Sequence, residues 1–365
     1  MWLQLGRWTA LPVLAWSSPV VAQEASSEAR LRVYADDDHV TVVSPSVATQ
    51  FDASESVRLA IASKVDAVSA ASVDVISSAS PGDVNELRLE GTANATWSLS
   101  SLMRLRAGSV VSVERDYTSL RPSIGGQIEV ANRNATIDLA YTAVVDSATH
   151  AIDESFKRKR RGHIVAAGLT QIADSSTYLD LLVDARRLDG YHASPYRRVL
   201  WRDSTMPVVT LLEERTPSIR SSGAAMLRLR RAMNSAATWF LHASYRFYRD
   251  SWEVSSHTVR AQLLREALDG RLLLSANLRG YQQGAADFYR AYYEMADTQL
   301  APQFRTADRT LGGMHSLHGS VSADAEAGPV HLRSSVSLTQ FNFKNFPAQR
   351  RRRAVTMELS VVTAW

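Results

Sequence analysis

Few residues in this sequence have the types and spacing that catalysis or metal binding requires. A hydrolytic site needs histidine close to serine, and His242, Ser256 and His257 lie on segments that adjacent strands would bring near one another. Their spacing alone gives no geometry, so a hydrolase is kept only as a minor alternative. His315 and His318 would face opposite sides of a strand and are not expected to bind one metal ion. We therefore predict no catalytic residues, no metal site and no cofactor.

The composition excludes several other chemistries. The sequence contains no cysteine, which rules out a disulfide framework, a thiolate metal site and a cysteine nucleophile. Its 41 Lys and Arg residues are nearly balanced by 37 Asp and Glu residues, and the net charge is only +4. Two basic runs occur, at 157–161 and 350–353, but aromatic residues do not interleave with them. Nucleic acid is therefore not a predicted partner.

A compact acidic turn offers a possible cation site. Asp36, Asp37 and Asp38 are consecutive and would supply the oxygen ligands that Ca²⁺ prefers. A solvated hairpin tip explains the same three residues, and we prefer that interpretation.

A larger set of charged residues alternates with apolar ones. Because an arginine or lysine in the middle of a bilayer costs about 2–4 kcal/mol when it faces lipid, such residues would face the interior of a barrel. Charges of both signs would pair across neighbouring strands and leave a polar path, unless side chains and loops close the lumen. The predicted lumen-lining residues are Glu86, Arg88, Glu90, Arg104, Arg106, Glu114, Asp138, Asp180, Asp184, Arg186 and Arg246.

The segments that carry these charges have a period of two. In 86–99 one face holds Leu87, Leu89 and Trp97, and the other holds Glu86, Arg88 and Glu90. A strand with one apolar and one wet face produces this pattern, and a helix does not. Many runs reach ten residues or more, which is the length that a tilted strand needs to cross a bilayer. The predicted strands are 29–35, 39–51, 56–67, 84–99, 102–115, 121–131, 135–147, 162–173, 176–187, 219–232, 236–248, 252–266, 271–283, 305–322, 330–343 and 354–365.

The connections alternate between tight turns and longer loops, the layout of outer-membrane barrels. The longer loops are expected near 68–83, 148–160, 188–218, 286–304 and 344–352. Aromatic residues are expected to form two belts at the membrane interfaces. Trp97, Trp239 and Trp365 would lie at the turn end, and Tyr117, Phe247, Tyr248 and Trp252 at the opposite end.

The two ends of the chain carry export signals. Residues 1–22 combine Arg7, an apolar run and the small-residue exit Val20-Val21-Ala22, which predicts a cleaved signal peptide. After residue 24, charged residues interrupt every apolar stretch before it reaches the ~18 residues that a membrane helix needs. The mature chain is therefore either soluble or a β-barrel. Residues 23–365 are predicted to form a single domain. The last strand ends at an aromatic residue, Trp365. Outer-membrane assembly machinery recognises terminal strands that end in this way.

Several motifs resemble one bacterial family. An eight-residue echo occupies 65–80, and further matches lie at 114–119, 190–197 and 245–252. Together they resemble the family known as domain of unknown function 3570. That resemblance implies an outer-membrane β-barrel of Gram-negative bacteria with no established activity, so it brings no catalytic residues.

These observations predict an all-β, antiparallel, up-and-down transmembrane barrel of about sixteen strands in the Gram-negative outer membrane. We interpret it as a channel, or as the outer pore of an export assembly with a periplasmic partner. The alternatives are a structural or partner-binding barrel without an open pore, and a barrel-embedded hydrolase. The other expected partners are the outer-membrane assembly machinery and outer-membrane lipid. The two basic runs would either contact lipopolysaccharide phosphates or remain solvated.

Overall fold

The computed structural model describes residues 25–70, 84–150, 152–203, 209–234, 236, 238–295 and 301–365. The predicted signal peptide, at 1–22, lies outside the described residues, as does the whole second half of the echo, 73–80. Within the described ranges, no helix has the length and apolar composition that spanning a membrane requires.

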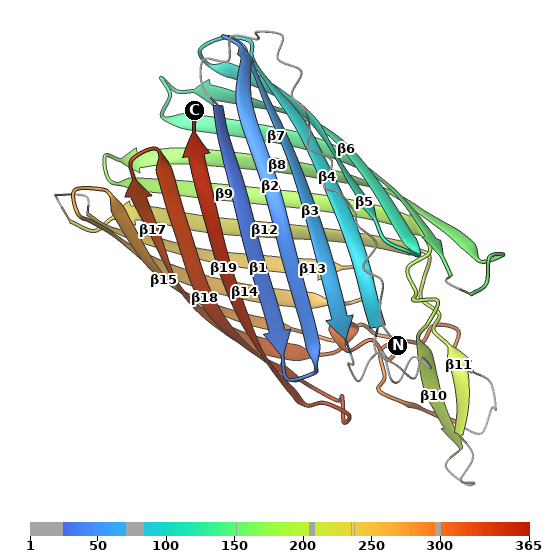
Figure 1. Ribbon diagram of the computed structural model, residues 1–365. Helices are drawn as coiled ribbons and strands as arrows, with labels where there is room; N and C mark the ends of the chain where they lie inside the picture. Colours follow the sequence, from blue (N-terminus) through green and yellow to red (C-terminus); the bar gives the residue numbers. More distant parts are fainter. Residues whose placement is uncertain are drawn as a thin grey trace, which may run out of the picture.

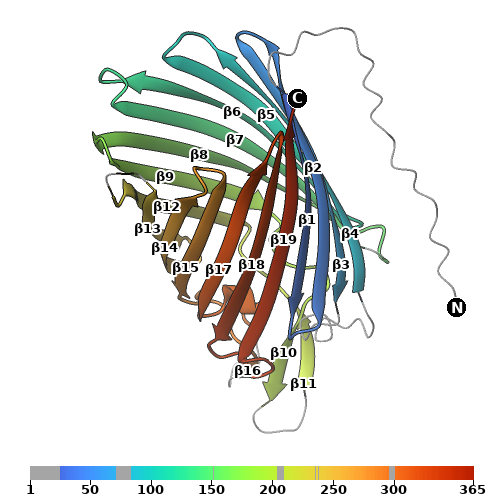
Figure 2. The ribbon, with the colours of Figure 1, turned by 60° about the vertical axis from the view of Figure 1, so that its left-hand side comes forward.

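The described residues form a closed barrel of sixteen antiparallel strands (Figures 1 and 2). Each strand pairs with its neighbours along the chain, and β1 closes the ring by pairing with β19. The barrel strands are β1 (Ala25–Asp36), β2 (Val40–Ser54), β3 (Val57–Ala70), β4 (Val84–Ser98), β5 (Met103–Val113), β6 (Tyr117–Val130), β7 (Ala135–Thr149), β8 (Lys157–Asp174), β9 (Thr177–Gly190), β12 (Ile219–Ala232), β13 (Trp239–Asp250), β14 (Ser255–Ala267), β15 (Leu272–Gln283), β17 (Met314–Ala327), β18 (Val330–Phe343) and β19 (Arg351–Ala364).

The predicted fold class is confirmed, and each of the sixteen predicted strands overlaps one barrel strand. The predicted starts of two strands differ from the structure by five residues or more. The basic run 157–161 was placed mainly in a loop but begins β8, because the ladder with β7 continues to Lys157 opposite Thr149. Residues 305–313 were placed in a strand but belong to a loop that contains the short 3₁₀ helix η1 (Arg309–Leu311).

Short turns occupy one end of the barrel and longer connections the other; we call these the turn end and the loop end. Gly270 and Gly328 adopt φ values of +85° and +63° at the turn end. Residues with a side chain rarely adopt this left-handed backbone conformation, which tight hairpin turns need.

Two loops at the loop end form a second sheet that the sequence analysis missed. Its strands are β10 (Arg198–Asp203), β11 (Val209–Glu213) and β16 (Tyr293–Met295). β10 pairs antiparallel with β11 and parallel with β16. β10 and β11 come from the loop 191–218 and β16 from the loop 284–313, so the sheet joins these two loops beyond the end of the barrel (Figure 1).

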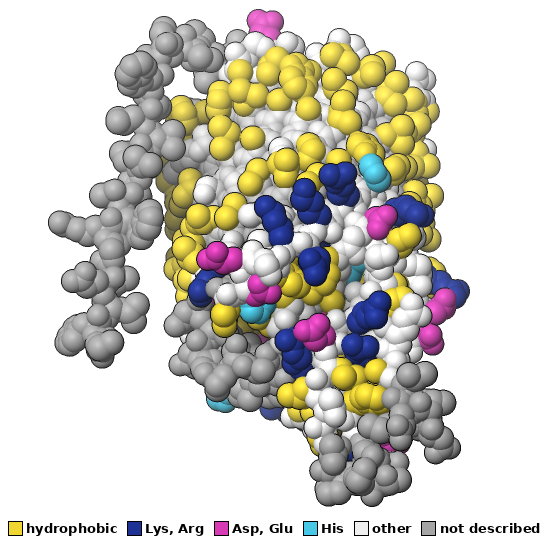
Figure 3. Space-filling view, turned by 90° about the vertical axis from the view of Figure 1, so that its right-hand side faces the viewer, with side chains coloured by type: hydrophobic (Ala, Val, Ile, Leu, Met, Phe, Trp, Pro, Cys, Tyr) yellow, Lys and Arg dark blue, Asp and Glu magenta, His cyan; other side chains and the backbone are white. Residues whose placement is uncertain are grey.

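The outer face of the barrel is apolar and exposed. Leu338, Leu227 and Val321 expose 63%, 62% and 61% of their surfaces. In water, this much apolar area would be unfavourable at about 25 cal/mol per Å². Apolar side chains cover the part of the wall toward the turn end, and charged side chains gather toward the loop end (Figure 3). The outer wall is therefore suited to hydrocarbon.

The predicted aromatic belt at the loop end is largely wrong. Phe247 lies on the outer face, next to His257. Tyr117, however, accepts a hydrogen bond from Arg160 on the inner side, and Tyr248 donates to Asp250 on the same side. Trp252 is buried in a cluster of loop residues. Strand parity and loop packing, rather than distance along the strand, decide which aromatic rings face outward.

The two faces predict different responses to a charge in β18. Leu338→Arg places a cation on the outer face and is expected to lower the free energy of unfolding in lipid vesicles by about 2–4 kcal/mol. Ser337→Arg, one residue away on the inner face, is expected to lower it by less than about 0.5 kcal/mol. Urea titration of both folded variants measures this difference. Equal destabilisation by the two arginines would contradict the assignment of faces.

Candidate functional site

The inner wall carries a network of ion pairs, beginning on β4 and β5. Arg88 lies 2.9 Å from Glu90 and 3.5 Å from Glu114, and its Nε donates to Ser112 at 2.9 Å. The antiparallel register produces this arrangement, because it sets Glu90 opposite Ser112. Three predicted lumen-lining residues are thus brought together.

A glycine allows the next pair to form across an intervening strand. Arg106 lies opposite Gly125 of β6, which itself lies opposite Ala140 of β7. Because Gly125 has no side chain, Arg106 reaches over β6 and contacts Asp138 at 2.6 Å. A Cβ atom on Gly125 would lie 2.8 Å from the Leu139 carbonyl oxygen, closer than side chains tolerate.

Two aspartates of β9 hold arginines from β12 and β13. Asp180 accepts from Arg230 at 2.8 Å and from Thr170 at 2.7 Å. Asp184 lies 3.3 Å from Arg246. These residues line a concavity of about 520 Å³ in the wall.

Nine of the eleven predicted lumen-lining residues therefore take part in ion pairs, since Arg104 also lies 4.0 Å from Glu129. Glu86 lines a second concavity of about 410 Å³ together with Arg88 and Glu114. Arg186 lies opposite Ser222 and Ile164, and it has no ion pair within the described part of the chain. That all eleven line a water-filled lumen stays a prediction.

The acidic turn is not a solvated tip, because its three carboxylates are engaged within the protein. The Asp38 side chain is 2% exposed and pairs with Arg309 of η1 at 2.6 Å. Asp36 accepts from Tyr34, and Asp37 accepts from the backbone N–H of Arg353 at 2.8 Å. No group of metal-binding side chains occurs in the ranges that the structure describes. The turn instead attaches the loop 284–313, which connects β15 and β17, to the β1–β2 hairpin.

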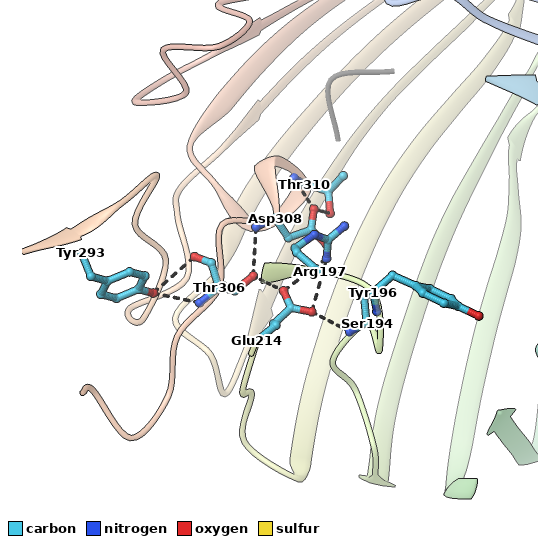
Figure 4. A network of polar contacts seen from close by, with 8 residues as sticks. All are labelled: Ser194, Tyr196, Arg197, Glu214, Tyr293, Thr306, Asp308 and Thr310. Atoms are coloured by element: carbon cyan, nitrogen blue, oxygen red, sulfur yellow. Dashed lines mark hydrogen bonds and ion pairs between the residues drawn. The ribbon is translucent and has the colours of Figure 1, made fainter. Parts of the chain in front are cut away.

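A second buried network joins the two long loops (Figure 4). The Glu214 carboxylate, 2% exposed, accepts from Arg197 at 3.2 Å and from the backbone N–H of Ser194 at 2.6 Å. It also accepts from the Thr306 hydroxyl, on the other loop. Arg197 reaches Asp308 of that loop at 2.8 Å. Sequence spacing did not indicate this site, because Arg197 and Asp308 are 111 residues apart.

The loop 284–313 has further contacts around the loop end. Trp252, of the β13–β14 turn, packs with Ala286 and Tyr289 in a buried cluster. The Tyr289 hydroxyl donates to the Asn345 carbonyl at 3.3 Å, on the β18–β19 connection. With the Asp38–Arg309 and Arg197–Asp308 pairs, these contacts attach one loop to four other connections. The loop is therefore held in place across part of the barrel end.

His192 is kept neutral where the loop 191–218 leaves β9. Burial, together with the positive charges of Arg160 and Arg220, lowers the pKa of His192 to about 4. The Arg160 guanidinium lies 3.5 Å from Nδ1 and can only donate, so this nitrogen is unprotonated. The ring packs edge-on against Trp252 at 5.3 Å.

The residues considered for a hydrolase are not brought together. His242 lies opposite Gln262, and His257 lies opposite Phe247, five positions away along the strand pair. His257 is on the outer face, where Nδ1 lies 2.8 Å from the Tyr245 hydroxyl. Ser256 is on the inner face opposite Gln283. Sequence spacing did not indicate this, because alternate residues of a strand face opposite sides of the sheet.

The basic runs are split between the two faces of the wall. Arg160 points inward and pairs with Asp146 at 2.7 Å, whereas Arg161 lies opposite the exposed Val145 on the outer face. Arg352 points inward and lies 3.8 Å from Asp36. Alternate cations therefore remain on the outer surface near the loop end.

A closed antiparallel barrel with an apolar outer wall and a charged inner wall defines the class of outer-membrane-type β-barrel proteins. Within that class, residues 24–340 match the family model described as protein of unknown function (DUF3570), and the chain belongs to this family. The resemblance seen in the sequence motifs is thereby confirmed. A search of curated proteins found no match to the chain.

Solved structures share the fold at low sequence identity. CdiB from Acinetobacter baumannii aligns with a TM-score of 0.54 and 7% identity, over 94% of this chain and 60% of CdiB. A bacterial polysaccharide outer membrane secretin aligns with a TM-score of 0.52 and 9% identity, over 94% and 99% of the two chains. The siderophore receptor PirA from Pseudomonas aeruginosa aligns with a TM-score of 0.44 and 7% identity, over 87% of this chain. This chain spans 56% of that receptor's length.

The buried network of Figure 4 predicts a local effect of Glu214→Gln. Removing the charge leaves Arg197 without one of its carboxylate partners, and losing one member of a buried ion pair costs about 3–5 kcal/mol. We expect faster proteolysis within 191–218 and 284–313, with the barrel itself intact in a heat-modifiability gel. Glu213→Gln is the matched control, because that side chain is 78% exposed. Similar proteolysis of the two variants would refute the role of the network.

The lowered pKa of His192 predicts an acid-sensitive loop. An exposed histidine titrates near pKa 6.5, so between pH 6.5 and about 4 the opened loop binds a proton that the packed loop does not. The packed state is therefore expected to lose stability as the pH falls through this window. Hydrogen exchange of residues 191–196, corrected for intrinsic rates, is expected to lose about tenfold protection from pH 7 to pH 5. His192→Gln should abolish this dependence, and an unchanged dependence in that variant would overturn the assignment.

Proposed function

We propose that the chain is an integral outer-membrane channel whose charged inner wall conducts small polar solutes. It acts alone or as the outer pore of an export assembly with a periplasmic partner. The observation that carries the proposal is the contrast between the two walls. Apolar side chains such as Leu227 are exposed outside, and ion pairs such as Arg106–Asp138 lie inside. Hydrocarbon solvates the first and water the second.

The exposure of the inner charges supports a water-filled lumen. The side chains of Arg104, Arg106 and Arg246 remain 48%, 47% and 39% exposed although each lies beside a carboxylate. A barrel of sixteen strands is too wide for its own side chains to fill the interior. Charges that are paired but still exposed are expected beside water, because burial without solvent would be costly.

The loops support a restricted entrance. In outer-membrane barrels, short turns face the periplasm and long loops face outward. On this orientation, the loop 284–313 lies at the outer mouth, held by Asp38, Glu214 and Trp252. A loop fixed over part of the mouth would set an upper limit on solute size. Outward-facing cations such as Arg161 would then lie near lipopolysaccharide phosphates.

A second function, partner binding by a barrel without an open pore, has one specific observation in its favour. The sheet formed by β10, β11 and β16 exposes Leu200, Val209 and Leu211 by 46%, 54% and 55%. Exposed apolar groups on a loop sheet are typical of interaction surfaces. A barrel that binds a partner there, with its lumen closed, would carry no current.

The absence of native cysteine makes a direct test possible. Ser244→Cys introduces a thiol on the inner face of β13, and Ala243→Cys introduces one on the outer face as the matched control. In planar bilayers, both variants are expected to conduct as the wild type does. A bulky charged thiol reagent is expected to reduce the conductance of the Ser244→Cys variant by at least half and leave that of the Ala243→Cys variant unchanged.

Two results would count against the proposal. Membranes that stay sealed with correctly folded protein would favour the partner-binding function. Equal effects of the reagent on the two variants would show that current does not pass along the inner wall.

A further inference from the structure

One part of the inner wall carries more positive charge than its carboxylates neutralise: at one end Arg228 shares Asp180 with Arg230, and beyond it the cations are not paired within the described ranges. The strand registers set Arg228 opposite Ser244, Ser244 opposite Arg260, and Arg260 opposite Arg279. Arg279 in turn lies opposite His318 of β17. We call Arg228, Arg260, Arg279 and His318 the basic row. It runs around the wall from β12 to β17 on the inner face, since the adjacent residues Leu227, Val259, Leu278 and Leu317 are exposed on the outer face.

The contact between Arg260 and Arg279 opposes folding. Directly opposed residues on antiparallel strands have Cβ atoms about 4.5–5.5 Å apart, and like charges in this position are destabilising. Within the described residues, neither arginine has an ion pair. Arg260 donates through Nε to Asn277, and the Arg279 guanidinium lies 5.2 Å from the centre of the Tyr281 ring. Both neighbours orient the guanidinium groups without neutralising them.

Asp180 lies opposite Arg228 at 3.8 Å, but on the strands of Arg260 and Arg279 no carboxylate lies near enough to compensate. The inward carboxylate of β14 is Glu266, six residues from Arg260 and thus about 20 Å away along the strand. On β17, Asp324 lies six residues from His318 and is engaged by Arg333 at 2.5 Å. Elsewhere on the wall, by contrast, Arg106 and Arg246 have acidic partners.

The opposite wall carries carboxylates as well as cations. In the closed strand order, β4 lies eight strands from β14, so the two strands face each other across the barrel. The inward residues of β4 include Glu86 and Glu90, with Arg88 between them, and Glu114 directly follows β5. A solute between the two walls would therefore experience a transverse field directed from the basic row toward these carboxylates.

The chemistry of the basic row matches oxyanions. Guanidinium groups present several N–H donors and bind phosphate or carboxylate oxygens in a fork geometry. Adjacent strands are about 4.8 Å apart, so Arg260 and Arg279 offer two cationic forks at the separation of neighbouring anionic groups in one small molecule. Arg228, two strands away from Arg260, extends the site by about 10 Å.

We propose that the basic row is an anion-binding site on the inner wall, which makes the channel prefer anions and retain solutes with two or more phosphate or carboxylate groups. The selectivity part of this inference rests on the proposed channel function, and the binding part does not. Such a site also gives the unfavourable Arg260–Arg279 contact a role, because a bound anion would neutralise it.

The binding test uses inorganic pyrophosphate and the detergent-folded full chain. Isothermal titration is expected to show one pyrophosphate bound by the wild type, and at least tenfold weaker binding by the double variant Arg260→Gln and Arg279→Gln. The double variant Arg260→Lys and Arg279→Lys keeps both charges and is expected to retain most of the affinity. The control, Arg106→Gln with Asp138→Asn, removes one ion pair at constant net charge and should bind as the wild type does. Equal binding by the glutamine variant and the wild type would overturn the proposal.

The selectivity test uses the reversal potential in a potassium chloride gradient. The wild type is expected to pass chloride at least threefold better than potassium, and the glutamine variant to lose that preference. Pyrophosphate added at millimolar concentration should reduce the chloride current of the wild type and of the control variant, and leave that of the glutamine variant unchanged. A conducting but cation-selective wild type would refute the inference and leave the channel function standing. Pyrophosphate binding without any current would refute the channel function and leave the anion site standing.

Discussion

Closure of the sheet between β1 and β19 is the constraint on which the rest of the structure depends. Hydrocarbon offers no hydrogen-bonding partner, so every backbone N–H and C=O in a spanning segment must be paired within the sheet. The pairing of Leu31 with Leu359 continues to the turn end, where Ala25 and Trp365 exchange backbone hydrogen bonds of 3.1 and 2.9 Å. Without this closure, the backbone groups of two edge strands would remain unpaired, and the sheet could not enter hydrocarbon. The apolar outer face would then have no stable solvent.

Closure also creates the interior and sets its chemistry. Once sixteen strands are joined, alternate residues must face inward, and their charges can pair only with residues that the register brings near. Most do pair, as Arg106 does with Asp138. In the described part of the chain, Arg260 and Arg279 do not, and they lie opposite each other on β14 and β15. At the loop end, the pairs Asp38–Arg309 and Arg197–Asp308 attach a long loop to the rim, so the same interaction that organises the wall also shapes its entrance.

The barrel was predictable from the sequence because its information is local. Alternation along segments such as 86–99 identifies a two-faced strand without knowledge of its neighbours. The sheet of β10, β11 and β16 was missed because its strands are six, five and three residues long and pair between distant loops. The inner ion pairs depend on register and on details such as the missing side chain of Gly125. The sequence could therefore identify charged inner faces, but not the partner of each charge or the unpaired state of Arg260 and Arg279.

The central claim is that hydrocarbon contacts one face of each barrel strand and water contacts the other. Spin labels placed singly at consecutive positions 332–341 of β18 in lipid vesicles test it most directly, through collision rates with oxygen and with a water-soluble nickel chelate. We predict that the collision rates alternate with a period of two residues. Collisions with oxygen should be favoured at even positions such as Leu338, and collisions with the chelate at odd positions such as Ser337. Even positions that are shielded from oxygen, or a loss of the alternation, would contradict it.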